Sequence, residues 1–165
     1  MNRQELRTSI AVGLLYLIRM MGLFMVIPVL PLASDDFKLS TTLLMGFAIG
    51  IHGLTQSLFQ IPFGMLSDRV GRKKIIALGL VLFTIGSSVA AVAENVYWLI
   101  IGRALQGCGA IASTLLALMS DLTRLEQRTK SMALIGAAIA SSFGLALLIG
   151  PILFNQYGTK SIFIF

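Results

Sequence analysis

Five long apolar stretches constrain this chain more than any other feature of its sequence. A helix that crosses the hydrocarbon core of a bilayer needs about 20 mostly apolar residues, and each stretch is close to that length or longer. A further apolar run starts at residue 161, but the residues that follow it are too few to cross a bilayer at about 1.5 Å each. We therefore expect an all-α integral membrane helical bundle with about five transmembrane helices and a stub. The predicted spans are residues 9–33, 41–66, 75–93, 97–120 and 132–154.

The composition agrees with a chain that lies in lipid. Hydrophobic residues make up 56% of the chain and charged residues 12%, whereas soluble domains are about 25% charged. A formal net charge of +6 is sometimes a sign of a nucleic-acid partner. Here the charges lie at the ends of the apolar stretches, so we expect a lipid bilayer as the surrounding partner and no nucleic acid.

The basic residues alternate between the two sides of the predicted bundle. The N-terminal segment and the connections after the second and fourth spans together hold nine of the 13 Lys and Arg residues. The connections on the opposite side hold only Lys38 and Lys160. Because loops rich in Lys and Arg remain in the cytoplasm, we expect the N-terminus to be cytoplasmic.

The connection after the second span combines acidic, basic and glycine residues. Basic residues that fix topology are common in such loops, but they do not explain Asp68 among them, or the flanking Gly64 and Gly71. Glycine permits a very tight turn between two helices. An acid among bases favours a fixed network of ion pairs.

This connection resembles the signature loop between helices two and three of the major facilitator superfamily. Its pattern is Gly, two residues, a small residue, Asp, Arg, one residue, Gly, Arg, and then Arg or Lys. The resemblance implies a conformational latch, in which Asp68 and Arg72 help to hold two halves of a carrier together in the outward-facing state. An acid at the cytoplasmic end of helix four often joins them, and Asp121 has that position. The latch residues are Gly64, Asp68, Arg69, Gly71, Arg72, Lys73 and Asp121.

The fourth span contains an arginine, Arg103, within the sequence GRALQGCGA. An arginine inside a span costs about 2.5–3.5 kcal/mol on insertion scales, so it needs a polar partner or a wet cavity. Gly107 and Ala110 follow it at i+4 and i+7, so we expect them on the same helical face, where they leave room beside the guanidinium. The stretch resembles the helix-four motif of proton-coupled drug exporters in this superfamily, which implies a role for Arg103 in proton coupling. The alternative is that Arg103 only braces neighbouring helices through hydrogen bonds.

The first span has an arginine, Arg19, and ends with Pro28 and Pro31. The prolines are compatible with a helix end or a kink. This segment resembles a helix-one motif of the twelve-helix drug:proton antiporter group. Arg19 either lines a cavity or pairs with a backbone carbonyl.

The fifth span contains Gly150 followed by Pro151. This pair matches the start of a glycine-rich helix-five motif of drug antiporters, but Ile152, Leu153 and Phe154 follow where that motif has a further glycine. The departure weakens the antiporter assignment more than the superfamily assignment. A sugar or metabolite carrier of the same superfamily therefore stays open as an alternative.

The second span carries a polar stripe, because His52, Gln56 and Gln60 are spaced by four residues. Polar groups are costly against lipid, so the stripe should face the bundle interior. It forms either a cavity wall that contacts substrate or protons, or a set of hydrogen bonds between helices. None of the seven acids lies at mid-membrane depth, so proton coupling would need His52, a residue type that can titrate near neutrality, an acid in the missing part, or something else.

Small residues four apart also occur in two spans, at Gly46 and Gly50 and at Gly136, Ala140 and Gly144. This spacing lets helix backbones approach closely in lipid. We expect these glycines to lie at contacts between helices.

A complete member of the superfamily has about twelve spans in two halves, with the substrate site between them. By this resemblance, residues 1–165 form a partial N-terminal transmembrane domain in a bacterial inner (plasma) membrane. The expected partners are a small-molecule substrate, protons and the missing C-terminal helices. The chain has no phosphate-binding loop and no metal-ligand spacing, so we expect no enzyme, no cofactor and no metal. The rival from another class is a short membrane protein that binds or regulates a full-length relative without transporting.

Overall fold

The computed structural model describes residues 2–164, apart from the side chain of Gln4, and it is helical throughout. Residues 2–164 contain no β-strand, only a single bridge between Lys38 and Asn95. Five helical segments are long and apolar enough to cross a membrane, and the fourth of them combines α4 and α5. The expectation of an all-α membrane bundle is therefore confirmed. The elements are α1 (Arg3–Val29), η1 (Ser34–Asp36), α2 (Thr42–Val70), α3 (Arg72–Ala91), α4 (Val96–Cys108), α5 (Ala112–Leu122), η2 (Leu125–Gln127), α6 (Arg128–Tyr157) and α7 (Ser161–Ile164).

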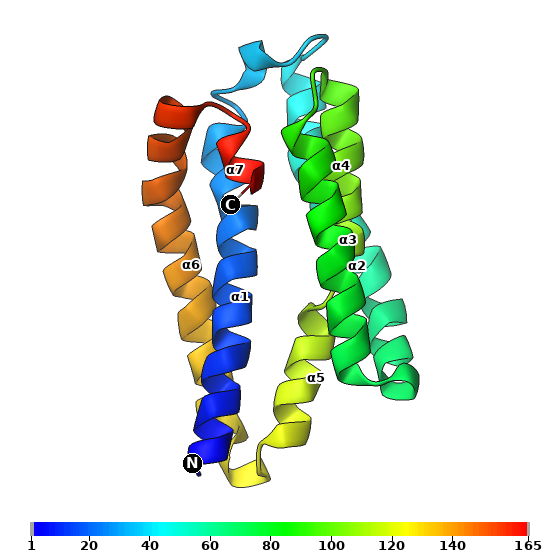
Figure 1. Ribbon diagram of the computed structural model, residues 1–165, viewed down its shortest axis with the longest axis vertical. Coiled ribbons are helices and arrows are strands. Elements are labelled where there is room, and N and C mark those ends of the chain that lie inside the picture. Colours follow the sequence, from blue (N-terminus) through cyan, green and yellow to red (C-terminus); the bar gives the residue numbers. More distant parts are fainter. Residues whose placement is uncertain (1, 165) are drawn as a thin grey trace.

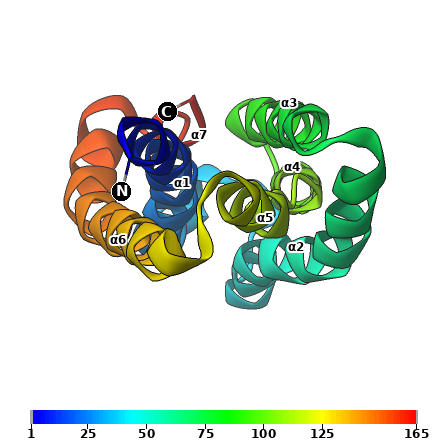
Figure 2. The same cartoon turned by 90° about the horizontal axis from the view of Figure 1, so that it is seen from below.

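The helices pack in two groups, which α5 connects. In Figure 1, α1 and α6 lie side by side, and α2, α3 and α4 form the second group. Figure 2 shows α5 between the groups on one side and α7 between α1 and α3 on the other. Two clusters of buried apolar side chains join the groups: one contains residues of α1, α2, α3, α4, α6 and α7, and the other contains residues of α1, α3, α5 and α6. A hydrogen bond of 3.1 Å between the hydroxyls of Ser9 and Ser131 adds a polar contact between α1 and α6.

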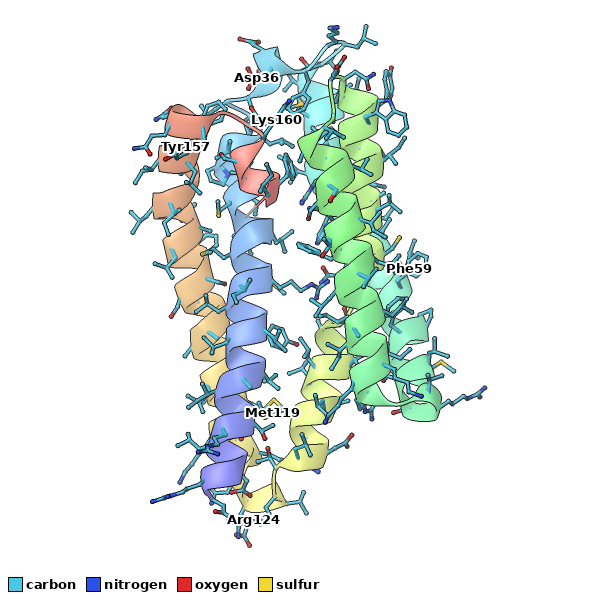
Figure 3. The ribbon with its side chains drawn as sticks, viewed as in Figure 1. Asp36, Phe59, Met119, Arg124, Tyr157 and Lys160 are labelled. Carbon is cyan, nitrogen blue, oxygen red and sulfur yellow. The ribbon has the colours of Figure 1, made fainter. Side chains whose placement is uncertain are left out.

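The basic connections lie at one end of the bundle. The start of α1, the turn between α2 and α3, and η2 are all at the lower end of Figure 1. The opposite end holds η1 and the turn before α7, where Asp36, Tyr157 and Lys160 lie (Figure 3). The charge pattern of the sequence therefore follows the geometry of the bundle.

An ion pair fixes the start of α1 to the connection before η2. Asn2 caps the helix, and the Glu5 carboxylate accepts the Asn2 backbone N–H at 2.6 Å. The same carboxylate accepts from Nε of Arg124 at 2.8 Å, and the Glu5 side chain is only 8% exposed. This partner raises the pKa of the Arg124 guanidinium above its usual value. Arg124 lies beside the lower end of α1 in Figure 3.

The fourth span is not one continuous helix. α4 ends at Cys108 and α5 begins at Ala112, so Ala110 lies in a break and does not continue the face that carries Arg103. The expectation that Arg103, Gly107 and Ala110 share one helical face is therefore wrong for Ala110. Two glycines in three residues weaken the helix, and donors from α1 satisfy backbone carbonyls at the break, as described below.

The glycines that make close helix contacts are not the ones that the four-residue spacing indicated. A Cβ at Gly86 or Gly102 would lie within 3 Å of backbone atoms of the opposing helix, so α3 and α4 touch through these two residues. The glycines at 46, 50, 136 and 144 have nothing within 4 Å of a Cβ among the residues that the structure describes. The packing expected of them is therefore absent between the helices of residues 2–164.

Candidate functional site

The turn between α2 and α3 consists of a single residue, Gly71. Its φ of +109° lies in a region that side-chain-bearing residues rarely adopt, so glycine is needed there. Because α2 extends to Val70 and α3 begins at Arg72, most of the signature stretch is helical. The tight turn places residues on either side of Gly71 within reach of one another.

Arg72 is the centre of the polar contacts at this turn. Its Nη1 lies 2.5 Å from Asp68 Oδ1 and donates to Ser67 Oγ at 2.6 Å. Its Nε donates to Asp121 Oδ2 at 3.1 Å. The Arg72 side chain is 22% exposed, while the side chains of Asp68 and Asp121 are 60% and 54% exposed. One guanidinium thus joins the ends of α2, α3 and α5, and the side chains of both acids remain partly exposed.

The other residues of the signature lie around this centre. Arg69 and Lys73 are exposed at the end of the bundle. Gly64 lies one turn earlier in α2, where an added Cβ would be 3.4 Å from the Ser113 hydroxyl of α5. The structure therefore brings together Asp68, Arg72 and Asp121, and leaves Arg69 and Lys73 outside the contact.

Arg103 is buried in α4, with 1% of its surface exposed. Its Nη1 donates to Gln106 Oε1 at 2.7 Å, and its Nε donates to the Ala48 carbonyl of α2 at 3.4 Å. Gln106 in turn donates through Nε2 to Ser87 Oγ of α3 at 2.7 Å. The network joins α2, α4 and α3 in the interior of the second helix group.

The polar stripe of α2 does not lie wholly inside the bundle. His52 is buried, and its Nε2 lies 3.1 Å from Gln56 Oε1. Its Nδ1 is buried and has no hydrogen-bond partner among the described residues. Gln56 and Gln60 are half-buried, and the Gln60 carbonyl accepts from Ser113 at 3.0 Å.

Arg19 of α1 both contacts a backbone carbonyl and lines a cavity. Its Nη2 donates to the Gly109 carbonyl at 2.5 Å, and its guanidinium lies 5.7 Å from the centre of the Phe83 ring. Its Nη1 is buried and has no hydrogen-bond partner in the described part of the chain. The cavity, of about 210 Å³, lies between α1, α3, α4 and α7, and Ser87 and Gln106 also line it.

The remaining motif residues lie at helix contacts or helix ends. Gly107 faces α2, where an added Cβ would overlap Thr55 Oγ1 and the His52 carbonyl. Gly150 of α6 faces α1, with the Met25 carbonyl 3.4 Å from the position of a Cβ. Pro28 lies in the last turn of α1, Pro31 just beyond it, and Pro151 within α6.

The sequence did not single out three polar residues of this interior. They are Tyr16, which donates to the Ala112 carbonyl at 2.7 Å, and the two partners in the Arg103 network, Ser87 and Gln106. The available signal was spacing, because Tyr16 precedes Arg19 by one helical turn and Gln106 follows Arg103 by one. None of the ion pairs among the described residues involves Arg19 or Arg103.

Comparison with known families matches residues 12–165 to the Major Facilitator Superfamily. The chain is 47% identical over 163 residues to Inner membrane transport protein YajR of Escherichia coli (strain K12), which covers 99% of this chain and 36% of that protein. It is 44% identical over 163 residues to Uncharacterized transporter BU466 of Buchnera aphidicola subsp. Acyrthosiphon pisum (strain APS), covering 99% and 42%. Identity to Multidrug resistance protein 1 of Bacillus subtilis (strain 168) is 30% over 153 residues, covering 92% and 38%.

The chain therefore spans less than half the length of these curated relatives. The family match nevertheless covers nearly all of the chain, from within the first span onward, and includes both buried arginines. It agrees with the motif at the turn after α2 and with the five apolar helical spans. This chain belongs to the major facilitator superfamily.

Proposed function

We propose that the full-length protein is a proton-coupled carrier that exports drug-like small molecules across a bacterial inner membrane by alternating access. This chain supplies five spans of the N-terminal half, with its N-terminus in the cytoplasm. Helices beyond the chain supply the rest of the carrier. The Arg72 centre, with Asp68 and Asp121, carries the proposal, because it fits the latch that the signature motif implies.

The exposed faces of α2 and α6 support a second half. Only 17% of an 18-residue apolar segment in each of these spans is buried within the chain, against 61% for the span of α4 and α5. The open glycines at 46, 50, 136 and 144 lie in the same two helices. Small residues on an open face permit close approach by further helices, so we place the second half against α2 and α6.

Arg103 and His52 are the proposed coupling groups of this half. Arg103 carries a charge in the bundle interior without an acidic partner among the described residues. His52 keeps a free nitrogen in the interior of the same helix group. Since no acid of this chain lies at mid-span, we place the proton-carrying acid in the helices beyond it, with His52 as the alternative. Gln56 and Gln60, with Arg19, then contribute polar groups to the substrate path.

Two observations bear on the substrate class, and they favour different classes. The motifs around Arg103 and Pro28 resemble those of drug exporters, and one relative is named as a multidrug resistance protein. The incomplete motif after Gly150 and Pro151 favours instead a carrier of sugars or other metabolites within the same superfamily. The third possibility, a short membrane protein that regulates a full-length relative, has no need of the Arg72 and Arg103 networks together.

Flux in proteoliposomes tests this function. In the full-length protein, we expect protons that flow down an imposed pH gradient to drive a lipophilic cationic dye in the opposite direction. The dye flux should saturate, and it should be lost when a protonophore collapses the gradient. Sugar-driven proton movement without dye flux would favour the metabolite carrier. An absence of flux with any solute would contradict transport.

The 165-residue chain by itself should not transport. Five spans cannot enclose a cavity that lies between two halves. The measurement is the same proteoliposome assay, with the full-length protein as the positive control. Saturable, substrate-specific flux by the short chain would overturn the proposed division into halves.

Removing the charge of Asp121 should weaken the latch. In the full-length carrier, Asp121→Asn removes the carboxylate that accepts from Arg72 Nε, and we expect transport to fall about tenfold, as for the loss of one charge-assisted hydrogen bond. The matched control is Glu126→Gln, which neutralises an exposed acid near the same end of the bundle. Equal transport by the two variants would show that the Arg72–Asp121 contact has no role in the cycle.

A further inference from the structure

The break between α4 and α5 is enclosed on two sides by other helices. On the α3 side, a Cβ at Gly79 would overlap the Ile111 side chain, and a Cβ at Gly109 would overlap the Gly79 carbonyl. Both Ala110 and Ile111 are fully buried. The break is thus a packed part of the interior.

The α1 side supplies hydrogen-bond donors to the break. Arg19 Nη2 donates to the Gly109 carbonyl at 2.5 Å, and the Tyr16 hydroxyl donates to the Ala112 carbonyl at 2.7 Å. A backbone carbonyl without a partner inside a membrane costs several kcal/mol. A buried guanidinium also needs an acceptor, so each group satisfies the requirement of the other.

The break connects to Arg103 through a short chain of contacts. The Gly109 N–H donates to the Gln106 carbonyl at 3.2 Å and closes the last turn of α4. The Gln106 side chain is the acceptor for Arg103 Nη1. The path from α1 to Arg103 therefore passes from Arg19 to Gly109, then to Gln106, and every group on it is buried.

We propose that Arg19 and Tyr16 are positioning residues: they hold the break in the fourth span in place and, through Gln106, keep Arg103 in the geometry that coupling requires. This inference rests on the proposed function of Arg103, and it assigns α1 a part in coupling. The two helix groups contact each other at this break, so a movement of α1 relative to α3 acts on Gly109. Arg103 then responds through the last turn of α4.

The single cysteine of the chain, Cys108, reports on the break directly. It is the last residue of α4 and is half-buried. In the full-length carrier, with any cysteine outside this chain replaced by serine, we would measure its rate of alkylation by N-ethylmaleimide. Arg19→Gln and Tyr16→Phe should each raise the rate about tenfold, as expected for the loss of one buried hydrogen bond. Arg19→Lys, which keeps the charge and a donor, should raise it less.

Matched controls separate this effect from general loosening. Arg7→Gln and Tyr97→Phe make the same chemical changes at exposed positions of α1 and α4, and they should leave the alkylation rate unchanged. If Arg19→Gln prevents folding, Tyr16→Phe decides the question, since it removes only a hydroxyl. Alkylation of Cys108 at the wild-type rate in folded Tyr16→Phe and Arg19→Lys proteins would overturn the proposal.

Transport separates positioning from a purely structural role. Tyr16→Phe should lower flux driven by a pH gradient about tenfold and leave substrate counterflow, which needs no net proton movement, close to wild type. Combined with Arg103→Ala, it should have no further effect, because residues of one network are not additive. An equal loss of driven flux and counterflow, or full additivity, would contradict positioning. If Arg103→Ala has no effect on coupling, the proposed function fails, while the Cys108 result still decides whether α1 holds the break.

Discussion

Arg103→Ala in the full-length carrier should lower flux driven by a pH gradient by roughly 100-fold or more and leave membrane insertion intact. The substitution removes the donor to Gln106 Oε1 and to the Ala48 carbonyl, and a buried acceptor without a partner costs about 1–3 kcal/mol. Each 1.4 kcal/mol corresponds to a factor of ten. Loss of the only charge in this network adds to that cost. The measurement is initial flux in proteoliposomes at matched protein content.

Arg103→Lys is the sharper variant, because it keeps the charge and loses the planar fork. Two nitrogens of the Arg103 guanidinium donate to acceptors on different helices, whereas a lysine side chain has only one nitrogen. We therefore expect Arg103→Lys to retain insertion and to lose most of the driven flux. Arg3→Ala, at an exposed position of α1, is the control. Driven flux at the full rate in Arg103→Ala would exclude a coupling role and leave Arg103 as a brace between helices.

The sequence predicted the spans because apolar length is a local property. It also predicted the tight turn at Gly71, since glycine there has a backbone reason that is visible without the fold. The sequence did not predict the partners of Arg103. The need for a partner follows from burial of a charge, but the choice of Gln106 and the Ala48 carbonyl depends on how α2 and α4 pack.

The break at residues 109–111 was missed for a related reason. Gly109, Ala110 and Ile111 lie in an apolar run that reads as continuous helix. What makes the break stable is the pair of donors from α1, which lie 90 and 96 residues earlier in the chain than their acceptors. Glycine spacing also failed to predict the helix contacts, because it shows that small residues line one face of a helix and does not show what packs against that face. Gly136 faces open space, whereas Gly107 faces α2.

The contact at Gly107 leads to the second large expected effect, on stability. A Cβ at this position would overlap Thr55 Oγ1 and the His52 carbonyl, and would lie 3.1 Å from the Gln56 backbone nitrogen. Two of these three atoms belong to the backbone of α2, so rotation of a side chain cannot relieve the overlap. Gly107→Ala must therefore push α4 away from α2, at a cost of about 1–3 kcal/mol or more. We expect a lower melting temperature in detergent for the full-length carrier.

Gly53→Ala is the matched control, because Gly53 lies in α2 one residue after His52 and has nothing within 4 Å of a Cβ among the described residues. Alanine in a helix interior is more favourable than glycine by roughly 0.5–1 kcal/mol, so this variant should melt at or above the wild-type temperature. The opposite signs of the two changes come from the same substitution on two helices that touch each other. Equal melting temperatures would mean that α2 and α4 do not meet at Gly107. The Arg103–Ala48 contact, which depends on the same helix pair, would then be in doubt as well.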